Sequence, residues 1–127
     1  MSTASTHVLD AARGLPAVGL EVRMTGPLPD AAPVASGGTA PGGVAHPGER
    51  PASGTRTAVT DADGRIAWGA LPAAGRYALT FATGPWFAAQ DRDTFFPQVT
   101  LDVTLGDAHT HVALLLSPFA YTTYRGS

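Results

Sequence analysis

The stretch Val18-Gly19-Leu20-Glu21-Val22-Arg23-Met24 decides the fold class, because apolar residues occupy every second position along it. A period of two puts alternate side chains on opposite faces of a β-strand. Residues 77–81 and 99–105 alternate in the same way, and no segment sustains the 3.6-residue period of an amphipathic helix. The sequence therefore predicts a mostly β protein whose strands each have one buried and one wet face.

One turn and one short helix are expected between the strands. Asp61-Ala62-Asp63-Gly64 supplies residues that tolerate tight or left-handed backbone, so we expect it to join a strand at 55–60 to a short strand at 66–68. Arg65 would then lie just past the turn. Residues 83–91 lack alternation, which favours a single short helix there.

The segment 27–54 differs in kind, because glycine and proline recur throughout it and large side chains are few. Such a segment cannot bury enough apolar surface to order itself. Loop closure costs only slightly more as a loop lengthens, so a small fold can carry it. We expect one domain over 1–127 with a flexible insertion at about 27–54, in which His46 is a surface residue.

Composition excludes several function classes. Charged residues make up 14% of the chain and the formal net charge is -2, so there is no basic surface that would attract nucleic acid. All eight basic residues are arginine. The absence of lysine excludes Schiff-base chemistry and the lysine of a nucleotide-binding loop.

The chain contains no cysteine. It therefore has no disulfide, no thiolate nucleophile and no sulfur-ligated zinc, which suits a reducing compartment. Its first residues lack a charged start and an apolar run, and no apolar stretch approaches the roughly 20 residues that cross a bilayer. We expect a soluble, unprocessed, cytoplasmic protein without a membrane partner.

Histidines mark the candidate site. His109 and His111 lie two apart on a predicted strand, so they share one face, while Val112 and the apolar residues that alternate with it face the other way. Such a pair can supply a base near neutral pH or two metal ligands, and it can also be an ordinary exposed strand face. A third strand histidine, His7, favours a site.

Arg65 is the candidate ligand-binding cation. Its planar guanidinium matches the coplanar oxygen and nitrogen atoms of an anionic heterocycle, although a solvated turn residue is the alternative. Asp61 and Asp63 are better explained as turn formers than as an acid-base pair. The large aromatic residues are assigned to core or interface packing: Trp68, Trp86, Phe87, Phe95 and Phe96.

Familiar catalytic signatures are absent from the sequence. It has no glycine-rich phosphate loop, no nucleophile elbow and no His-Glu-x-x-His helix. Histidine-assisted attack by water is the chemistry that remains.

Four motifs carry a resemblance to a known family. They are Ser5-Thr6-His7-Val8-Leu9-Asp10, Thr60-Asp61-Ala62-Asp63-Gly64-Arg65, Phe95-Phe96-Pro97, and residues 114–119 together with Tyr124-Arg125-Gly126-Ser127. They resemble motifs of the transthyretin-like 5-hydroxyisourate hydrolases, a branch of the transthyretin superfamily. The hormone-carrying transthyretins lack both the closing tetrapeptide and the opening histidine, so the resemblance favours the hydrolase branch.

The resemblance implies a two-sheet antiparallel sandwich with one short helix, and a homotetramer with sites between dimers. It implies an enzyme that opens the six-membered ring of 5-hydroxyisourate by hydrolysing a ring amide, with no organic cofactor. No metal is assigned, and a zinc ion bound by the histidines stays an alternative. The family's catalytic positions fall on His7, Arg65, His111 and Ser127. Tyr124, Arg125 and His109 would bind substrate.

Two points stay open at the sequence level. Either His7 or His111 could be the base, and Ser127 is better suited to orienting substrate or water than to forming an acyl-enzyme. Thr110 stands where the family usually has tyrosine and Ala113 where it has proline. Both flank His111, so an enzyme for another cyclic amide or biosynthetic intermediate is an alternative, as is a non-enzymatic carrier of small planar ligands.

Overall fold

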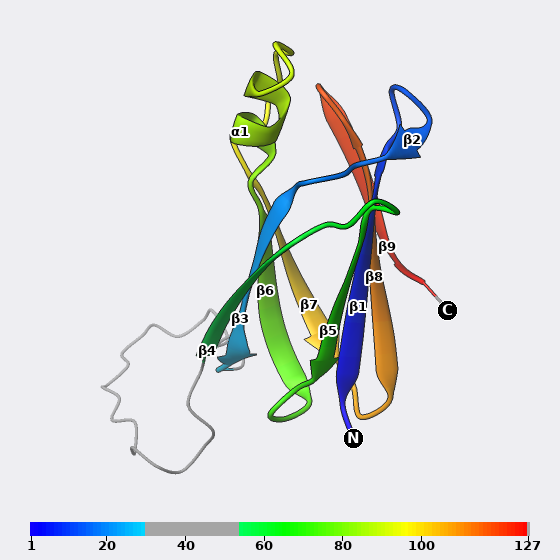
Figure 1. The fold of residues 1–127 in the computed structure, drawn as a ribbon. Coiled ribbons are helices and arrows are strands. Elements are labelled where there is room, and N and C mark those ends of the chain that lie inside the picture. Colours follow the sequence, from blue (N-terminus) through cyan, green and yellow to red (C-terminus); the bar gives the residue numbers. More distant parts are fainter. Residues whose placement is uncertain (30–53, 127) are drawn as a thin grey trace, which may run out of the picture.

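Two β-sheets pack face to face in the computed structural model, which describes residues 1–29 and 54–126, and a short helix lies at one end (Figure 1). The predicted mostly β, two-sheet fold with one short helix is confirmed. In chain order the elements are β1 (Thr3–Asp10), β2 (Leu15–Pro16), β3 (Glu21–Leu28), β4 (Gly54–Val59), β5 (Arg65–Ala70), β6 (Gly75–Phe81), α1 (Thr83–Ala88), β7 (Val99–Leu105), β8 (His109–Ser117) and β9 (Ala120–Gly126).

The sheet order places the first strand beside the eighth. One sheet runs β2-β1-β8-β9, with β5 also paired to β1, and the other runs β4-β3-β6-β7. The pairs are antiparallel except for β1 and β8, which run parallel. The parallel register puts Thr3 opposite His109 and Ser5 opposite His111. Residues from both ends of the chain therefore meet on one sheet.

The core between the sheets follows the predicted alternation with one exception. Tyr77, Leu79 and Phe81 are almost completely buried, as the alternation predicts. Val18 was expected to face the core with its neighbours but is 50% exposed. The reason is a turn at Gly19, whose φ of 78° lies in the left-handed region, so that β3 begins only at Glu21.

The predicted turn at 61–64 connects β4 in one sheet to β5 in the other. A carboxylate oxygen of Asp61 accepts the backbone N–H groups of Asp63, at 2.8 Å, and Arg65, at 2.9 Å, which confirms Asp61 as a turn former. Gly64 has φ 75°, and a side chain there would collide with the carbonyl oxygen of Val8. The turn therefore packs closely against β1, and Arg65, which follows it, lies next to that strand.

The helix α1 falls inside the predicted 83–91 segment. Phe87 of this helix and Trp68 of β5 are buried, and Trp86 and Phe96 pack against the core. Phe95, in contrast, is 73% exposed. Core packing therefore accounts for four of these five aromatic side chains.

Some predictions fall beyond the part of the chain that the structure describes. Residues 30–53, which make up most of the predicted insertion, and Ser127 are among them. Within the described ranges, no helix combines the length and the apolar character that spanning a membrane requires.

Candidate active site

Polar side chains from three strands gather on the outer face of the sheet that contains β1. Along β1 the outward positions alternate with buried ones, and the same alternation places two histidines of β8 on this side. The apolar residues that follow His111 at alternate positions, beginning with Val112, belong to the core, as the sequence predicted. We call this set the histidine face: Thr3, Ser5, His7, Arg65, His109 and His111.

Three predicted catalytic side chains meet here. The ring centroids of His7 and His111 lie 6.3 Å apart, with the ring planes inclined at 42°. Arg65 on β5 is directly opposite His7 on β1. The two imidazoles and the guanidinium therefore come from three different strands and can reach one small molecule together.

A serine connects the two histidines of β8. The hydroxyl of Ser5 lies 2.7 Å from Nδ1 of His111 and 2.9 Å from Nε2 of His109. The hydroxyl of Thr3 lies 2.7 Å from Nδ1 of His109. Since Nδ1 of His111 is engaged by Ser5, its Nε2 is the nitrogen left for a ligand or a water molecule.

A polar cavity of about 480 Å³ borders this face. Its volume is within the range of sites for small molecules. Its lining combines imidazole, hydroxyl, guanidinium and carboxylate groups with apolar surface: Ser5, Thr6, Asp61, Arg65, Ile66, Ala67, His109 and His111.

The surroundings of His111 keep it neutral. Burial lowers the pKa of His111 below its ordinary value of 6.5, and the neighbouring His7, Arg65 and His109 lower it further, because each disfavours a second positive charge. At neutral pH the ring therefore retains a lone pair, as a general base must.

Gly126 lies directly against the ring of His111. The two residues are opposite each other in the pairing of β8 with β9. A Cβ atom on Gly126 would lie 2.5 Å from Cδ2 of the imidazole, which is closer than real Cβ contacts come. Only glycine lets the ring keep this position.

The other predicted substrate-binding residues lie on β9. Tyr124 pairs with Ala113, so it projects on the side of His111, and it is 53% exposed. Arg125 pairs with Val112, whose side chain faces the core, and lines a separate cavity of about 250 Å³. Within one chain, Arg125 therefore projects away from the histidine face, and its role in substrate binding stays a prediction.

Sequence reasoning gave no role to Ser5, Thr3 or Gly126. The alternation Thr3, Ser5, His7 within the opening strand was the available signal, because it puts all three side chains on one face. Metal ligation by the histidines was an alternative in the sequence. In the described ranges, no cluster of three or more histidine and carboxylate side chains is arranged to hold a metal ion.

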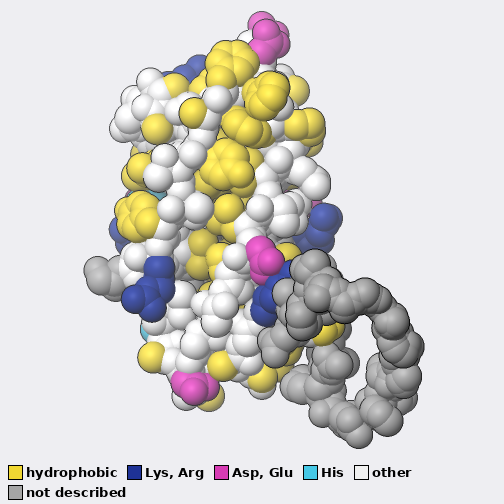
Figure 2. Space-filling model, turned by 180° about the vertical axis from the view of Figure 1, so that it is seen from behind, with side chains coloured by type: hydrophobic (Ala, Val, Ile, Leu, Met, Phe, Trp, Pro, Cys, Tyr) yellow, Lys and Arg dark blue, Asp and Glu magenta, His cyan; other side chains and the backbone are white. Residues whose placement is uncertain are grey.

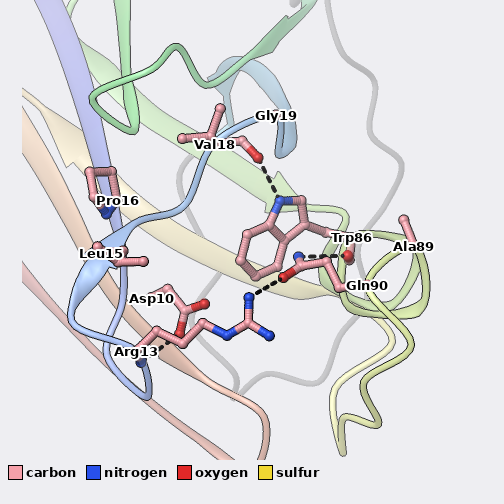
Figure 3. Close-up of a pocket in the computed structure, with 9 residues that line it drawn as sticks. All are labelled: Asp10, Arg13, Leu15, Pro16, Val18, Gly19, Trp86, Ala89 and Gln90. Carbon is pink, nitrogen blue, oxygen red and sulfur yellow. Dashed lines mark hydrogen bonds between the residues drawn. The ribbon is translucent and has the colours of Figure 1, made fainter.

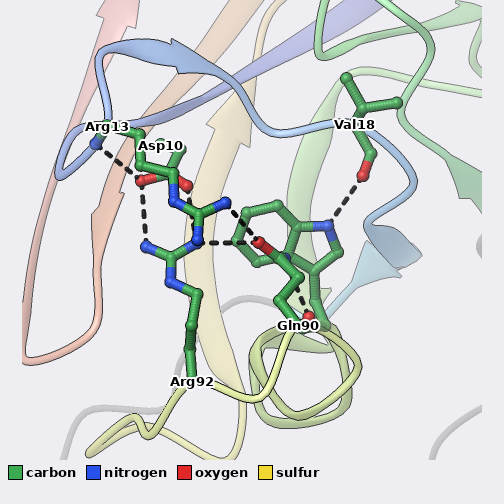
Figure 4. A network of polar contacts seen from close by, with 6 residues as sticks. Asp10, Arg13, Val18, Gln90 and Arg92 are labelled. Carbon is green, nitrogen blue, oxygen red and sulfur yellow. Dashed lines mark hydrogen bonds and ion pairs between the residues drawn. The ribbon is translucent and has the colours of Figure 1, made fainter.

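A second polar cluster lies near α1, beside a cavity of about 360 Å³ that is also lined by Trp86 and Val18 (Figure 3). Arg92 donates to Asp10 at 2.8 Å and to Gln90 at 2.9 Å. The side chains of this ion pair are only 14% and 3% exposed, respectively. We call this set the closed cluster (Figure 4): Asp10, Arg13, Gln90 and Arg92.

The sequence matches the HIUase/Transthyretin family over residues 4–126. It is 38% identical to a 5-hydroxyisourate hydrolase of Deinococcus radiodurans over 97% of this chain and 94% of that one. The structure resembles that of Klebsiella pneumoniae 5-hydroxyisourate hydrolase, with a TM-score of 0.68, 38% identity and coverage of 99% and 100% of the two chains. It also resembles the transthyretin of Sparus aurata, with a TM-score of 0.73, 24% identity and coverage of 99% and 97%, a likeness of fold alone.

Proposed function

This chain belongs to the HIUase/transthyretin family, and from that premise we propose that it is a 5-hydroxyisourate hydrolase, an enzyme of urate degradation. The identity to proteins of that name extends over nearly the whole chain. The reaction is the hydrolytic opening of the six-membered ring at a ring amide.

One observation carries the proposal: Arg65 and His111 line a cavity sized for a small heterocycle, and His7 lies beside the His111 ring and opposite Arg65 on a third strand. A carrier of hormones or other planar ligands needs an apolar slot, and it has no need of two imidazoles beside a guanidinium. This arrangement supports an enzyme over a carrier.

The side chains suggest a division of roles. His111, neutral at physiological pH, takes a proton from water through Nε2, and the hydroxide attacks the carbonyl carbon of the ring amide. Arg65 binds the anionic substrate and offsets the negative charge that develops on the carbonyl oxygen. Transfer of the proton from His111 to the amide nitrogen then accompanies cleavage of the C–N bond.

His7 completes this arrangement from the neighbouring strand. Its ring is close enough to that of His111 for both to contact the same water or carbonyl group. We assign His7 to orienting the attacked group, and Ser127, Tyr124 and His109 to supporting roles around the substrate. Arg125, which projects away from the histidine face of its own chain, would reach a substrate only from a neighbouring subunit. We assign the base to His111, one of the two histidines between which the sequence did not decide.

We also propose a cytoplasmic homotetramer. The edge strand β9 is exposed along most of its length, and an open edge is a surface that can pair with another chain. Large apolar side chains are exposed near it, with Phe119 at 69%. Figure 2 shows apolar side chains gathered on one face, mostly toward the end that carries α1. Association of subunits through such surfaces would shield them from water.

The position of the family departures bears on substrate choice. Thr110 alternates with His111 along β8, so its side chain is on the opposite side of the strand. Ala113 is opposite His7 in the parallel pair and is the departure closest to the site. A related cyclic amide is therefore the second candidate substrate.

The direct test is the ultraviolet decay of freshly generated 5-hydroxyisourate, with the product identified by NMR. We expect the protein to accelerate the decay and to yield the ring-opened ureido-imidazoline carboxylate. A decay rate unchanged by the protein would exclude this substrate. Activity on another cyclic amide, with none on 5-hydroxyisourate, would establish the second candidate.

A further inference from the structure

An unbroken chain of hydrogen bonds leads from the candidate base to solvent. It begins at Nδ1 of His111, passes through the hydroxyl of Ser5 to Nε2 of His109, and continues from Nδ1 of His109 to the hydroxyl of Thr3. All three distances are between 2.7 and 2.9 Å. The chain zigzags between β1 and β8 because their parallel register aligns Thr3 with His109 and Ser5 with His111.

The number of protons in this chain restricts its direction. A serine hydroxyl has one proton to donate, and a neutral imidazole has one N–H and one lone pair. If Ser5 donates to His109, it must accept the Nδ1–H of His111, which leaves Nε2 of His111 unprotonated. If Ser5 donates to His111 instead, Nε2 of His111 carries the proton and cannot act as a base.

Protonation of His109 selects between these two directions. A cationic imidazole donates from both nitrogens, so His109 would then occupy Ser5 as an acceptor. Ser5 then no longer donates to His109 and is free to turn its own proton toward Nδ1 of His111, an arrangement in which the remaining proton of a neutral His111 lies on Nε2. His109 is exposed and therefore exchanges protons with solvent.

We propose that Ser5 is a positioning residue that makes the basicity of His111 at Nε2 depend on the protonation of His109. This inference rests on the proposed function for its catalytic meaning, but not for its hydrogen-bond pattern. When His109 is neutral, the hydrogen bonds are donated in the direction from His111 to Thr3, and Nε2 of His111 has a free lone pair. When His109 is charged, the direction of donation between His109 and His111 reverses, and Nε2 of His111 carries a proton.

Other charged groups face His111 without contacting Nδ1. His7 on β1 lies beside its ring, Arg65 on β5 and Asp61 in the preceding turn line the same cavity, and Tyr124 on β9 is opposite Ala113, two residues further along β8. Burial, and after it His7, Arg65 and His109, lower the pKa of His111. Among the described residues, only Ser5 hydrogen-bonds to Nδ1, so only Ser5 can decide which nitrogen holds the proton.

The histidine tautomers can be measured without substrate, by long-range ¹H–¹⁵N correlation of the ¹⁵N-labelled protein during a pH titration. We expect His111 to carry its proton on Nδ1 when His109 is neutral and to switch to Nε2 at the midpoint of the His109 titration. A His111 that holds its proton on Nε2 throughout, or that ignores the His109 midpoint, would overturn the proposal. Because no turnover is involved, this result is independent of the proposed reaction.

Substitutions at Ser5 test whether its hydroxyl couples the His111 tautomer to the protonation of His109 or whether the side chain only fills space. Ser5→Ala should uncouple the His111 tautomer from His109, and Ser5→Thr, which keeps a hydroxyl, should restore the coupling. Ser117→Ala, on the same strand face as His111 but away from the chain of hydrogen bonds, serves as the matched control. Persistence of the coupling in Ser5→Ala would contradict the role of Ser5.

The kinetic counterpart distinguishes positioning from binding. We expect Ser5→Ala to lower kcat about 10- to 100-fold with little change in KM, because substrate contacts remain while the base loses its fixed tautomer. Ser5→Thr should recover most of kcat. A loss confined to KM would assign Ser5 to substrate binding instead.

Discussion

The closed cluster and the histidine face are both polar and both joined by hydrogen bonds, but they differ in what they leave open. In the closed cluster, the carboxylate of Asp10 accepts from Arg92 and from the backbone of Arg13, and the guanidinium of Arg92 also stacks 4.7 Å above the ring of Phe87. On the histidine face, no described residue hydrogen-bonds to Nε2 of His111 or to the guanidinium of Arg65. Polar groups whose hydrogen bonds are all made within the protein are typical of a structural network. Polar groups left without a partner are typical of a site that binds a ligand.

Electrostatics separates the two clusters in the same way. Burial alone would raise the pKa of Asp10, but the hydrogen bonds and charges of Arg92 and Arg13 outweigh it and lower the pKa below 3.8. The pKa of His111 is lowered by burial and by like charges. The lowered pKa of Asp10 reflects an ion pair that stabilises the fold. The lowered pKa of His111 reflects surroundings that disfavour its charged form and so keep it available as a base.

The largest expected effect is on the histidine face. His111→Gln should lower kcat/KM about 100- to 10,000-fold, the range for loss of a general base. Its folded state should survive, because the side chain is outside the core. Ultraviolet decay kinetics would measure the loss of kcat/KM, and thermal unfolding of the same preparation would show whether the fold survives. Wild-type turnover by this variant would remove His111 from the mechanism.

The converse substitution should break the closed cluster. Asp10→Ala leaves the partly buried guanidinium of Arg92 without its carboxylate partner, which we expect to lower the free energy of unfolding by about 3 kcal/mol. Turnover per folded molecule should remain near that of the wild type. Urea titration gives the stability, and active-site kinetics gives the turnover. Loss of turnover with intact stability would show that this cluster also serves the reaction.

A glycine pair gives a finer test. Gly126→Ala should push the His111 ring from its position and lower kcat/KM about tenfold, an effect that a displacement of 1 Å can exceed. Gly106→Ala is the matched control, because a Cβ there meets nothing within 4 Å. Kinetics of the two variants side by side would decide. Equal activity in both would mean that the contact with Gly126 has no influence on the base.

The smallest expected effect is a difference between the pH at which activity is lost and the lower pH at which the fold is lost. On the acid side kcat/KM should fall for two reasons: His109 becomes charged and reverses the hydrogen bonds through Ser5, and His111, whose pKa lies below 6.5, is itself protonated. The stabilisation from Asp10 is present above pH 3.8 and is lost only as pH falls through its lowered pKa. The enzyme should therefore lose activity while still folded. Simultaneous loss of activity and circular dichroism would contradict this order.

The sequence predicted the local structure well, and its main error is instructive. Alternation located the strands at 77–81 and 99–105, and its absence located α1. Val18 continued the alternation of its strand, but the left-handed turn at Gly19 separates it from β3. A period of two cannot reveal where the backbone turns, because glycine is compatible with both conformations.

The site was predicted as a list of residues rather than as an arrangement. The spacing of His109 and His111 fixed their shared face, because that is a property of one strand. The link through Ser5 and the contact with Gly126 depend on the register between strands that are distant in sequence. The same holds for the pairing of Arg125 with Val112. Local patterns do not specify such pairings, since they arise from packing of the whole sheet.

The most direct test of the central claim, that the imidazoles of β1 and β8 act on one substrate as a unit, is a double-mutant cycle on kcat/KM between His7→Gln and His111→Gln. The account predicts that the double variant is within a few-fold of the poorer single variant, because groups that act together are lost together. Losses that multiply, or single variants that keep full activity, would contradict it.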